Sequence, residues 1–229
     1  MSIFSFARKT QPDGRTWTYT YSGNGMLAEV TRSDRSCVRF KYDALGRRTE
    51  KAVTEAPGNN ESGGWREKVV KYLWDGNIPL HEWEEERTTD SIPVAQPVVD
   101  YKADFLVKLE KRAEEKARKE AEKGQEPPEN LVTWIFEDDF VPRAKITRDG
   151  CYSIISDHLG TPVEAYAGED GKVWERELDI YGRVKTGRNE TGDKNFIPFR
   201  FQGRYEDGET GLYYNRFRYY SPEEGCYTQ

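Results

Sequence analysis

The sequence predicts a mainly β fold, in which repeated antiparallel strands form part of a large coiled sheet and one long charged helix is inserted. Three observations support this prediction. Aromatic residues make up 13% of the 229 residues although the mean hydropathy is -0.93, and Tyr and Trp suit sheets with one wet face because they join an apolar ring to a polar tip. Twenty glycines and eleven prolines supply frequent turns. Short stretches of sequence also recur at a fixed spacing, which indicates a repeat architecture.

The clearest repeat relates residues 13–21 to residues 34–42, with an offset of 21 residues. The large side chains alternate within each copy; they are Trp17, Tyr19 and Tyr21 in the first and Val38, Phe40 and Tyr42 in the second. A period of two indicates strands with one buried and one exposed face. Such a two-stranded unit cannot bury its face alone, so it must pair edge to edge with its neighbours in one long sheet that coils or closes.

A hairpin turn is predicted after each of these strands. Asn24-Gly25 is a strong hairpin signal, and Gly46 takes the matching place 21 residues later; both glycines stand where a tight turn needs a positive φ. The unit returns at residues 157–160 and, in a shortened form, at residues 181–184. The residues that we assign to this repeat-turn motif are Tyr21, Gly25, Tyr42, Asp43, Gly46, Arg47, Asp157, Gly160, Tyr181, Gly182 and Arg183.

The repeats are interrupted by a segment of different composition. Residues 100–123 contain no Gly or Pro and are dominated by Ala, Glu, Lys and Arg, which predicts a helix of about 23 residues, about 35 Å long. We interpret it as a solvated helical insertion; a partner-binding or coiled-coil arm is the alternative, but the segment has no a/d seam. We therefore divide the chain into a repeat region (1–99), a helical insertion and linker (100–130) and a C-terminal β region (131–229).

Composition and charge exclude several classes of function. The net charge of -6 makes nucleic acid a poor partner, and no apolar run reaches the roughly 18 residues of a membrane-spanning helix. The N-terminus has no apolar stretch of the kind found in signal peptides. The three cysteines are odd in number and far apart, which argues against a disulfide framework or a zinc site. We expect no cofactor and no metal.

Residues that could carry chemistry have plainer interpretations. Ser156, Asp157 and His158 are neighbours in sequence, whereas the members of a catalytic triad converge from separate segments. His81 and the acidic residues Glu82 and Glu84–Glu86 are interpreted as a solvated acidic strand end rather than a metal site. The acidic clusters at residues 137–139 and 206–207 lack the spacing of a calcium loop. Cys226 has no base beside it in the sequence.

The segment from Ile197 to Pro222 resembles the hallmark of the Rhs/YD-repeat family core. The residues that carry this resemblance are Pro198, Phe199, Phe201, Gln202, Gly203, Gly211, Leu212, Tyr213, Tyr214, Asn215, Arg216, Tyr219, Tyr220 and Pro222. Residues 42–47 resemble the YD signature itself, and residues 72–76 and 156–162 resemble further stretches of that core. The resemblance covers nearly the whole chain except residues 100–128.

The resemblance implies a fold and a role. In that family, YD repeats wind into a hollow β-shell around a variable C-terminal toxin, which contact-dependent or type VI secretion systems deliver to rival bacteria, and related shells serve insecticidal toxin complexes. The hallmark marks the plug that closes the shell, and in many members a D-P-x-G element follows, where an aspartyl-protease-like self-cleavage frees the toxin. This sequence ends at Gln229, where that element would be expected, and holds only a few repeats.

We therefore expect a non-enzymatic shell fragment of a polymorphic toxin. Its expected partners are the rest of the shell and the enclosed toxin, with secretion components or an immunity protein in addition, and its expected location is the bacterial cytoplasm before export within a larger protein without a signal peptide. Two alternatives remain open: a self-cleaving segment with Asp207 and Glu206 as its acids, and an aromatic-rich module that binds cell-surface carbohydrate. Arg216 and Arg218 are expected to flank aromatic rings or to pair with Glu206, Asp207 or Glu209.

Overall fold

The computed structural model describes residues 5–10, 14–55, 65–89, 127–137, 140–168, 171–201 and 203–228. These residues form antiparallel strands and turns and contain no helix, so the prediction of a mainly β fold is confirmed. The helix predicted for residues 100–123 lies outside the described residues.

Thirteen strands form one large sheet in which each strand pairs with its neighbours in the chain. They are β1 (Ser5–Thr10), β2 (Thr16–Tyr21), β3 (Leu27–Arg32), β4 (Cys37–Tyr42), β5 (Arg48–Glu55), β6 (Trp65–Asp75), β7 (Ile78–Thr89), β8 (Val132–Glu137), β9 (Val141–Thr147), β10 (Gly150–Ser156), β11 (Pro162–Ala167), β12 (Lys172–Leu178) and β13 (Val184–Asn189). A smaller sheet contains β14 (Tyr205–Asp207), β15 (Leu212–Asn215), β16 (Arg218–Ser221) and β17 (Cys226–Tyr227).

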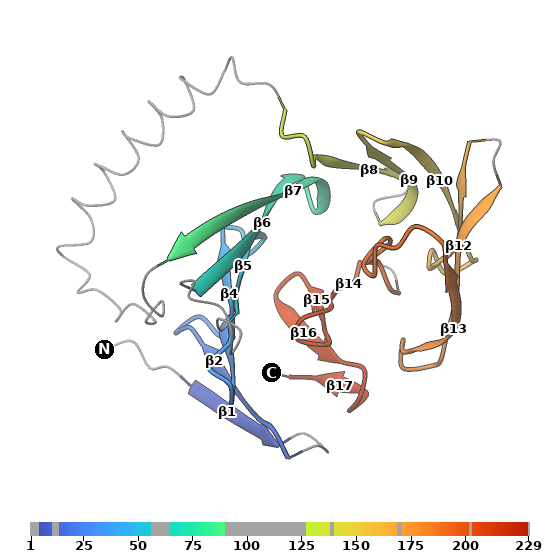
Figure 1. The fold of residues 1–229 in the computed structure, drawn as a ribbon. Coiled ribbons are helices and arrows are strands. Elements are labelled where there is room, and N and C mark those ends of the chain that lie inside the picture. Colours follow the sequence, from blue (N-terminus) through green and yellow to red (C-terminus); the bar gives the residue numbers. More distant parts are fainter. Residues whose placement is uncertain are drawn as a thin grey trace.

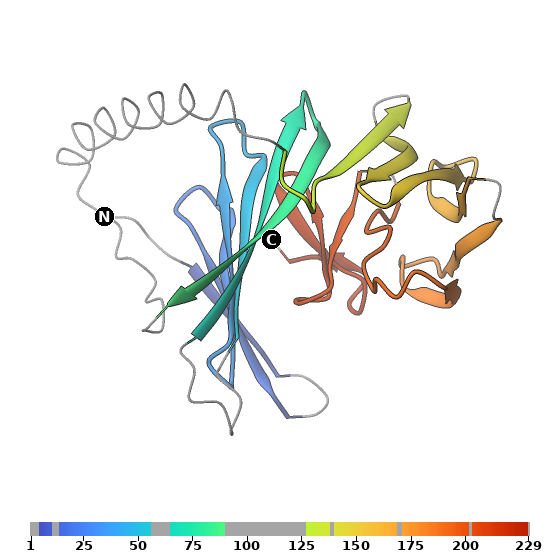
Figure 2. The same cartoon turned by 45° about the horizontal axis from the view of Figure 1, so that its top comes forward.

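The large sheet curves around the small one (Figure 1). We call β1–β7 the N-terminal arm and β8–β13 the C-terminal arm; in the second view the small sheet again lies between the two arms (Figure 2). The arms meet where β7 pairs with β8 through only two residue pairs, His81 with Thr133 and Glu82 with Val132. By contrast, β6 and β7 pair along eleven positions. We call this short β7–β8 junction the seam.

The alternation read from the sequence is present in the strands. β2 and β4 begin at Thr16 and Cys37 and end at Tyr21 and Tyr42, so they repeat the 21-residue offset. The inward side chains of this arm form one core with residues of the small sheet: Tyr19, Tyr21, Leu27, Val30, Val38, Phe40, Val53, Leu212, Tyr214 and Tyr219. A second core in the C-terminal arm joins Trp134, Ile154, Ala165 and Trp174 to Phe196, Ile197 and Phe199. Tyr205 packs against both cores and so links the two arms.

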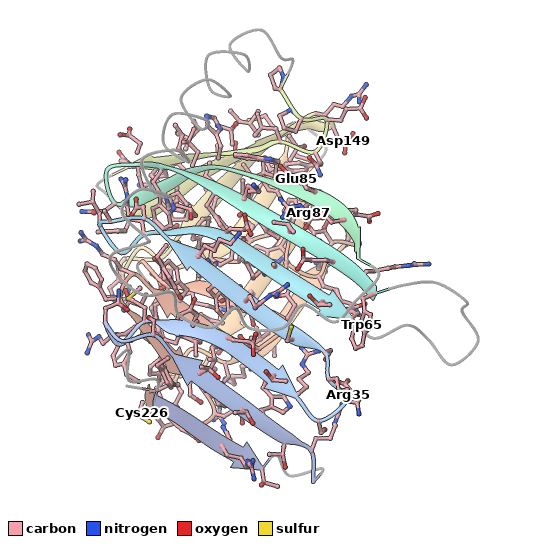
Figure 3. The ribbon with its side chains drawn as sticks, turned by 90° about the vertical axis from the view of Figure 1, so that its left-hand side faces the viewer. Arg35, Trp65, Glu85, Arg87, Asp149 and Cys226 are labelled. Atoms are coloured by element: carbon pink, nitrogen blue, oxygen red, sulfur yellow. The ribbon has the colours of Figure 1, made fainter. Side chains whose placement is uncertain are left out.

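The outer face of the N-terminal arm is polar, which explains how a sheet protein has so low a mean hydropathy. The Glu50 carboxylate lies 2.7 Å from Lys41 Nζ and 3.4 Å from Lys71 Nζ, on the strands to either side. Figure 3 looks onto this face, where Glu85 and Arg87 lie close together on β7 and pair at 3.0 Å. The exposed pair of Glu85 and Arg87 contributes little stability, whereas Glu50 is buried between its two lysines.

The repeat turns share one hydrogen-bond pattern. Asp43 Oδ1 accepts the backbone N–H groups of Leu45 and Arg47, both at 2.9 Å, and Asp43 Oδ2 accepts Arg47 Nε at 2.7 Å. Gly46 closes the turn with a φ of 74°, which an L side chain adopts only with strain. Two further turns repeat this arrangement: Asp157 binds Leu159 and Thr161, and Asp179 binds Tyr181 and Arg183. These turns join β4 to β5, β10 to β11 and β12 to β13. Because neighbouring strands are antiparallel, all three turns lie at the same end of the strands.

Gly46→Ala is expected to destabilise the chain more than Gly76→Ala. Both glycines have positive φ, so each substitution costs about 1–2 kcal/mol of backbone strain. Only at Gly46 would the new methyl group overlap a side chain, the ring of Phe217, whereas Gly76 faces open space. The free energy of unfolding in urea measures both costs. In a Phe217→Ala background the extra cost at Gly46 should vanish, and an extra cost that persists there would contradict this account.

Candidate functional site: the plug and its seat

The small sheet and the segment before it form a unit that sits against the concave face of the large sheet (Figures 1 and 2). We call residues 193–201 and 203–228 the plug. Two consecutive tyrosines of β15 point in opposite directions because side chains alternate along a strand. Tyr213 Oη donates to the carbonyl of Gly182 at 2.7 Å, and Tyr214 Oη donates to the carbonyl of Gly46 at 3.2 Å. The plug therefore ties a turn of the C-terminal arm to a turn of the N-terminal arm.

A buried ion pair lies at the centre of the contact with the N-terminal arm. Arg48 Nη1 donates to Asp207 Oδ2 at 2.6 Å, and the two side chains are 1% and 0% exposed. The Arg48 guanidinium is surrounded by four aromatic rings, whose centroids lie 4.6–5.7 Å from Cζ: Phe40, Tyr72, Tyr205 and Tyr214. Burial alone would lower the pKa of Arg48, but the Asp207 carboxylate raises it above its ordinary value. Arg48 therefore stays charged and pairs with Asp207 of the plug.

Lys51 adds a second cation to the same seat. Its Nζ lies 2.7 Å from Glu209 Oε2 and 3.5 Å from Asp207 Oδ1. Burial works against ionisation of both side chains. The electrostatic contributions of Tyr72, Asp207 and Glu209 nevertheless raise the pKa of Lys51, and Lys51 lowers the pKa of Glu209. Two cations of the arm thus meet two carboxylates of the plug, and this matching of charge favours one register of docking.

Glu82 lies at the seam and faces the plug. Its Oε2 accepts the hydroxyl of Tyr205 at 2.7 Å. The prediction that Glu82 belongs to a solvated acidic strand end is therefore wrong; neighbouring His81 bonds through Nδ1 to Thr133 Oγ1 at 2.9 Å across the seam. Burial raises the pKa of Glu82, although the Tyr205 hydrogen bond and the charges of Lys145 and Lys51 oppose this shift.

Glu82→Gln is expected to stabilise the chain increasingly as the pH rises. The carboxyl has a raised pKa in the folded state, so its contribution to stability is fully present below the unfolded pKa and is lost as the pH rises through the folded pKa. The gain of the Gln variant over the native chain should grow across that range and then level off, by about 1.4 kcal/mol for each unit between the two pKa values. Urea unfolding from pH 4 to pH 8 measures it. In a Tyr205→Phe background the rise should extend to higher pH, because a hydrogen bond that lowers the pKa is gone; a gain that shrinks with pH would contradict this assignment.

Basic side chains of the C-terminal arm bind backbone carbonyl groups at the start of the plug. Arg176 donates to the carbonyls of Ile197 and Phe199, and Lys145 Nζ donates to the carbonyl of Phe196 at 2.8 Å. The Phe199 ring packs edge-on against Trp134, with centroids 4.8 Å apart. Basic side chains that point inward satisfy these buried carbonyls, which cannot reach a strand partner.

Most hallmark residues lie within the plug and away from solvent. Those that are buried are Pro198, Phe199, Leu212, Tyr213, Tyr214, Tyr219, Tyr220 and Pro222, whereas Phe201, Gly203 and Asn215 are partly buried and Gly211 and Arg216 are exposed. Gln202 lies outside the described residues. Arg218 stacks over Tyr227 and Arg216 over Phe217, at 3.9 and 4.7 Å from the ring centroids. No ion pair joins either arginine to the three acids proposed as partners; Glu206 pairs with Arg200, and Asp207 and Glu209 pair with the N-terminal arm.

Sequence reasoning missed several residues of this contact. Asp179 is the turn aspartate between β12 and β13, and Tyr181 takes the place of Leu45 rather than that of Tyr42. The shared spacing of Asp and Gly three residues apart could have identified Asp179. The inward cations Arg48, Lys51, Lys145 and Arg176 were also missed; for Lys51, the signal was a charge in phase with the inward Val53.

The candidate catalytic residues have structural surroundings. Asp157 Oδ1 accepts two backbone N–H groups of its own turn, and Asp207 faces Arg48 and Lys51. Cys226 is exposed and free. Within the described ranges, no three His, Cys, Asp or Glu side chains converge into a group that could hold a metal ion. None of the chain described here forms a helix long and apolar enough to cross a membrane.

The large sheet is built from antiparallel hairpin repeats and curves around the C-terminal plug. This architecture defines the class of β-shells that are built from repeats. The RHS Repeat family model matches residues 7–36. The chain is 32% identical over 228 residues to toxin protein Tse5 of Pseudomonas aeruginosa, and 29% identical over 230 residues to double-stranded DNA deaminase toxin A of Burkholderia cenocepacia. The chain belongs to the Rhs family.

The matches cover nearly all of this chain but little of its relatives. They include 94% and 96% of this chain, yet the chain spans only 15% of Tse5 and 14% of the deaminase toxin. Among solved structures, the fold is similar to part of a TcdB2-TccC3-TEV crystal structure, with a TM-score of 0.62 at 16% identity over 92% of this chain and 9% of the other. It is also similar to part of the Photorhabdus luminescens Tc holotoxin pore, with a TM-score of 0.55 at 13% identity over 96% of this chain and 11% of that one.

Proposed function

We propose that this chain is a non-catalytic wall segment of an Rhs toxin, whose β-shell encloses a toxin domain encoded elsewhere in the same protein. The observation that carries the proposal is the plug: its Arg48–Asp207 pair and its tyrosines hold two arms of the wall around it. A wall needs strands, turns and buried ties, and the carboxylates that could act as acids are engaged in those ties. Similarity to named toxins of which the chain spans a small share supports a part within a larger toxin.

The proposal extends to delivery and partners. The larger protein is made in the bacterial cytoplasm and then delivered to competing cells, with the toxin protected by the shell and an immunity protein protecting the producer.

Limited proteolysis of the product of the complete native gene tests the proposal. The expected result is a protease-resistant particle that contains residues 1–229 together with a protected segment from outside them. A gene that encodes nothing beyond these residues would overturn the proposal. So would digestion of the outside segment at the rate of an isolated, unenclosed chain.

A further inference from the structure

A cavity of 260 Å³ opens at the seam, between the two arms and the plug. Trp74 and Pro79 line it from the N-terminal arm, Phe136 and Phe140 from the C-terminal arm, and Phe199 and Tyr205 from the plug. Binding sites for drug-sized molecules measure about 300–1,000 Å³. This cavity is smaller and apolar, and its size suits a single large side chain.

A cationic side chain, that of Arg216, lies at the cavity. Arg216 lines it from the turn between β15 and β16, where its backbone has a φ of 56°, a strained value for any residue other than glycine. Its side chain is exposed, rests on the Phe217 ring and makes no ion pair with any of the described residues. Arg200 of the plug, by contrast, pairs with Glu206. Arg216 is therefore available to an anionic ligand.

We propose that the seam cavity is a docking site for an acidic polypeptide segment, which inserts one aromatic or large aliphatic side chain and places a carboxylate on Arg216. The apolar walls would remove the inserted side chain from water, and the guanidinium would form charge-assisted hydrogen bonds with the carboxylate. The chain as a whole has a net charge of -6, so its overall field does not attract an acidic partner. Recognition must come from this local pairing.

Because of the position of the cavity, a docked segment would stabilise the assembly of the two arms and the plug. The cavity walls belong to three units, and at the seam the arms share only the two residue pairs of β7 and β8. A ligand that contacts all three units binds only while they are together, so it stabilises the assembled chain by RT ln(1 + [L]/Kd). This inference concerns the 229-residue chain itself and does not rest on the proposed enclosure of a toxin.

Binding of short peptides to the 229-residue chain tests the proposal. The probe is acetyl-Glu-Phe-Glu-amide; acetyl-Glu-Ala-Glu-amide lacks the anchor and acetyl-Lys-Phe-Lys-amide reverses the charge. The Trp74 indole N–H, which donates to the Arg48 carbonyl at 2.6 Å, reports on the cavity through its NMR shift. We expect saturable shifts and a raised unfolding midpoint with the first peptide and neither effect with the other two.

Two matched variants locate the charge. Arg216→Gln should weaken binding of acetyl-Glu-Phe-Glu-amide by about tenfold, the loss of one charge-assisted contact. Arg218→Gln, which removes an exposed cation two residues away over Tyr227, should leave the affinity unchanged. Absence of binding by the first peptide would overturn the proposal. Equal binding of the lysine peptide, or equal losses in the two variants, would overturn it as well.

Discussion

Replacement of Asp207 by alanine is expected to lower the free energy of unfolding by about 3–5 kcal/mol. Asp207 is fully buried and faces both Arg48 and Lys51. Removal of the carboxylate leaves two buried cations with less compensation, and the aromatic rings around Arg48 replace only part of the lost attraction. Urea unfolding, followed by the near-ultraviolet signal of the buried aromatic residues, measures the loss.

Two controls separate the buried pair from ordinary surface charge. Glu84→Gln removes an ion pair with Lys68 in which both side chains are about half exposed, and it should cost no more than about 1 kcal/mol. The double variant Arg48→Met with Asp207→Leu should recover most of the loss, because it leaves neither charge unpaired. A cost of Asp207→Ala as small as that of Glu84→Gln would contradict the seat described here.

Replacement of Tyr214 by alanine is the second large effect, with an expected loss of about 3–5 kcal/mol. Its buried ring contacts those of Tyr42, Trp74 and Tyr219. Its hydroxyl also accepts the backbone N–H of Arg48 at 2.9 Å. Tyr214→Phe keeps the ring but leaves that buried N–H without a partner, so we expect a loss of about 1–3 kcal/mol.

Tyr213 provides the matching test on the other arm. Tyr213→Phe removes the hydrogen bond to Gly182, and the resulting increase in hydrogen exchange should appear in β12 and β13, whereas that of Tyr214→Phe should appear in β4 and β5. Tyr166→Phe, which removes a hydrogen bond to the partly exposed Glu164, serves as a control and should change the stability by less than about 0.5 kcal/mol. Identical exchange patterns for Tyr213→Phe and Tyr214→Phe would contradict the two-sided tie.

The local parts of this fold could be predicted because their causes lie within a few residues. Alternation in β2 and β4 follows from side-chain geometry, and Gly46 follows from the needs of a tight turn. In the shortened form of the turn, Gly182 and Arg183 take the places of Gly46 and Arg47, but Tyr181 takes that of Leu45, because Asp179 performs the role of Asp43.

The seat of the plug could not be predicted because its partners are distant in the chain. Arg48 and Asp207 are separated by 159 residues, and Tyr205 and Glu82 by 123. Period and composition mark Arg48 as an ordinary strand residue, and only the curvature of the sheet brings it to Asp207. The interpretation of the acidic residues after His81 rests on composition alone, whereas in the structure one of them, Glu82, faces the plug and bonds to Tyr205.

Hydrogen exchange of the backbone amides in β15 and β16 tests the central claim most directly, because it asks whether the C-terminal hallmark is a seated plug. The account predicts that the amides of Tyr213, Tyr214 and Tyr220 exchange only when the whole chain unfolds, together with those of β4 and β5. Exchange of these amides at the rate of an unstructured chain, while β4 and β5 remain protected, would show that the wall folds without its plug and would contradict the account.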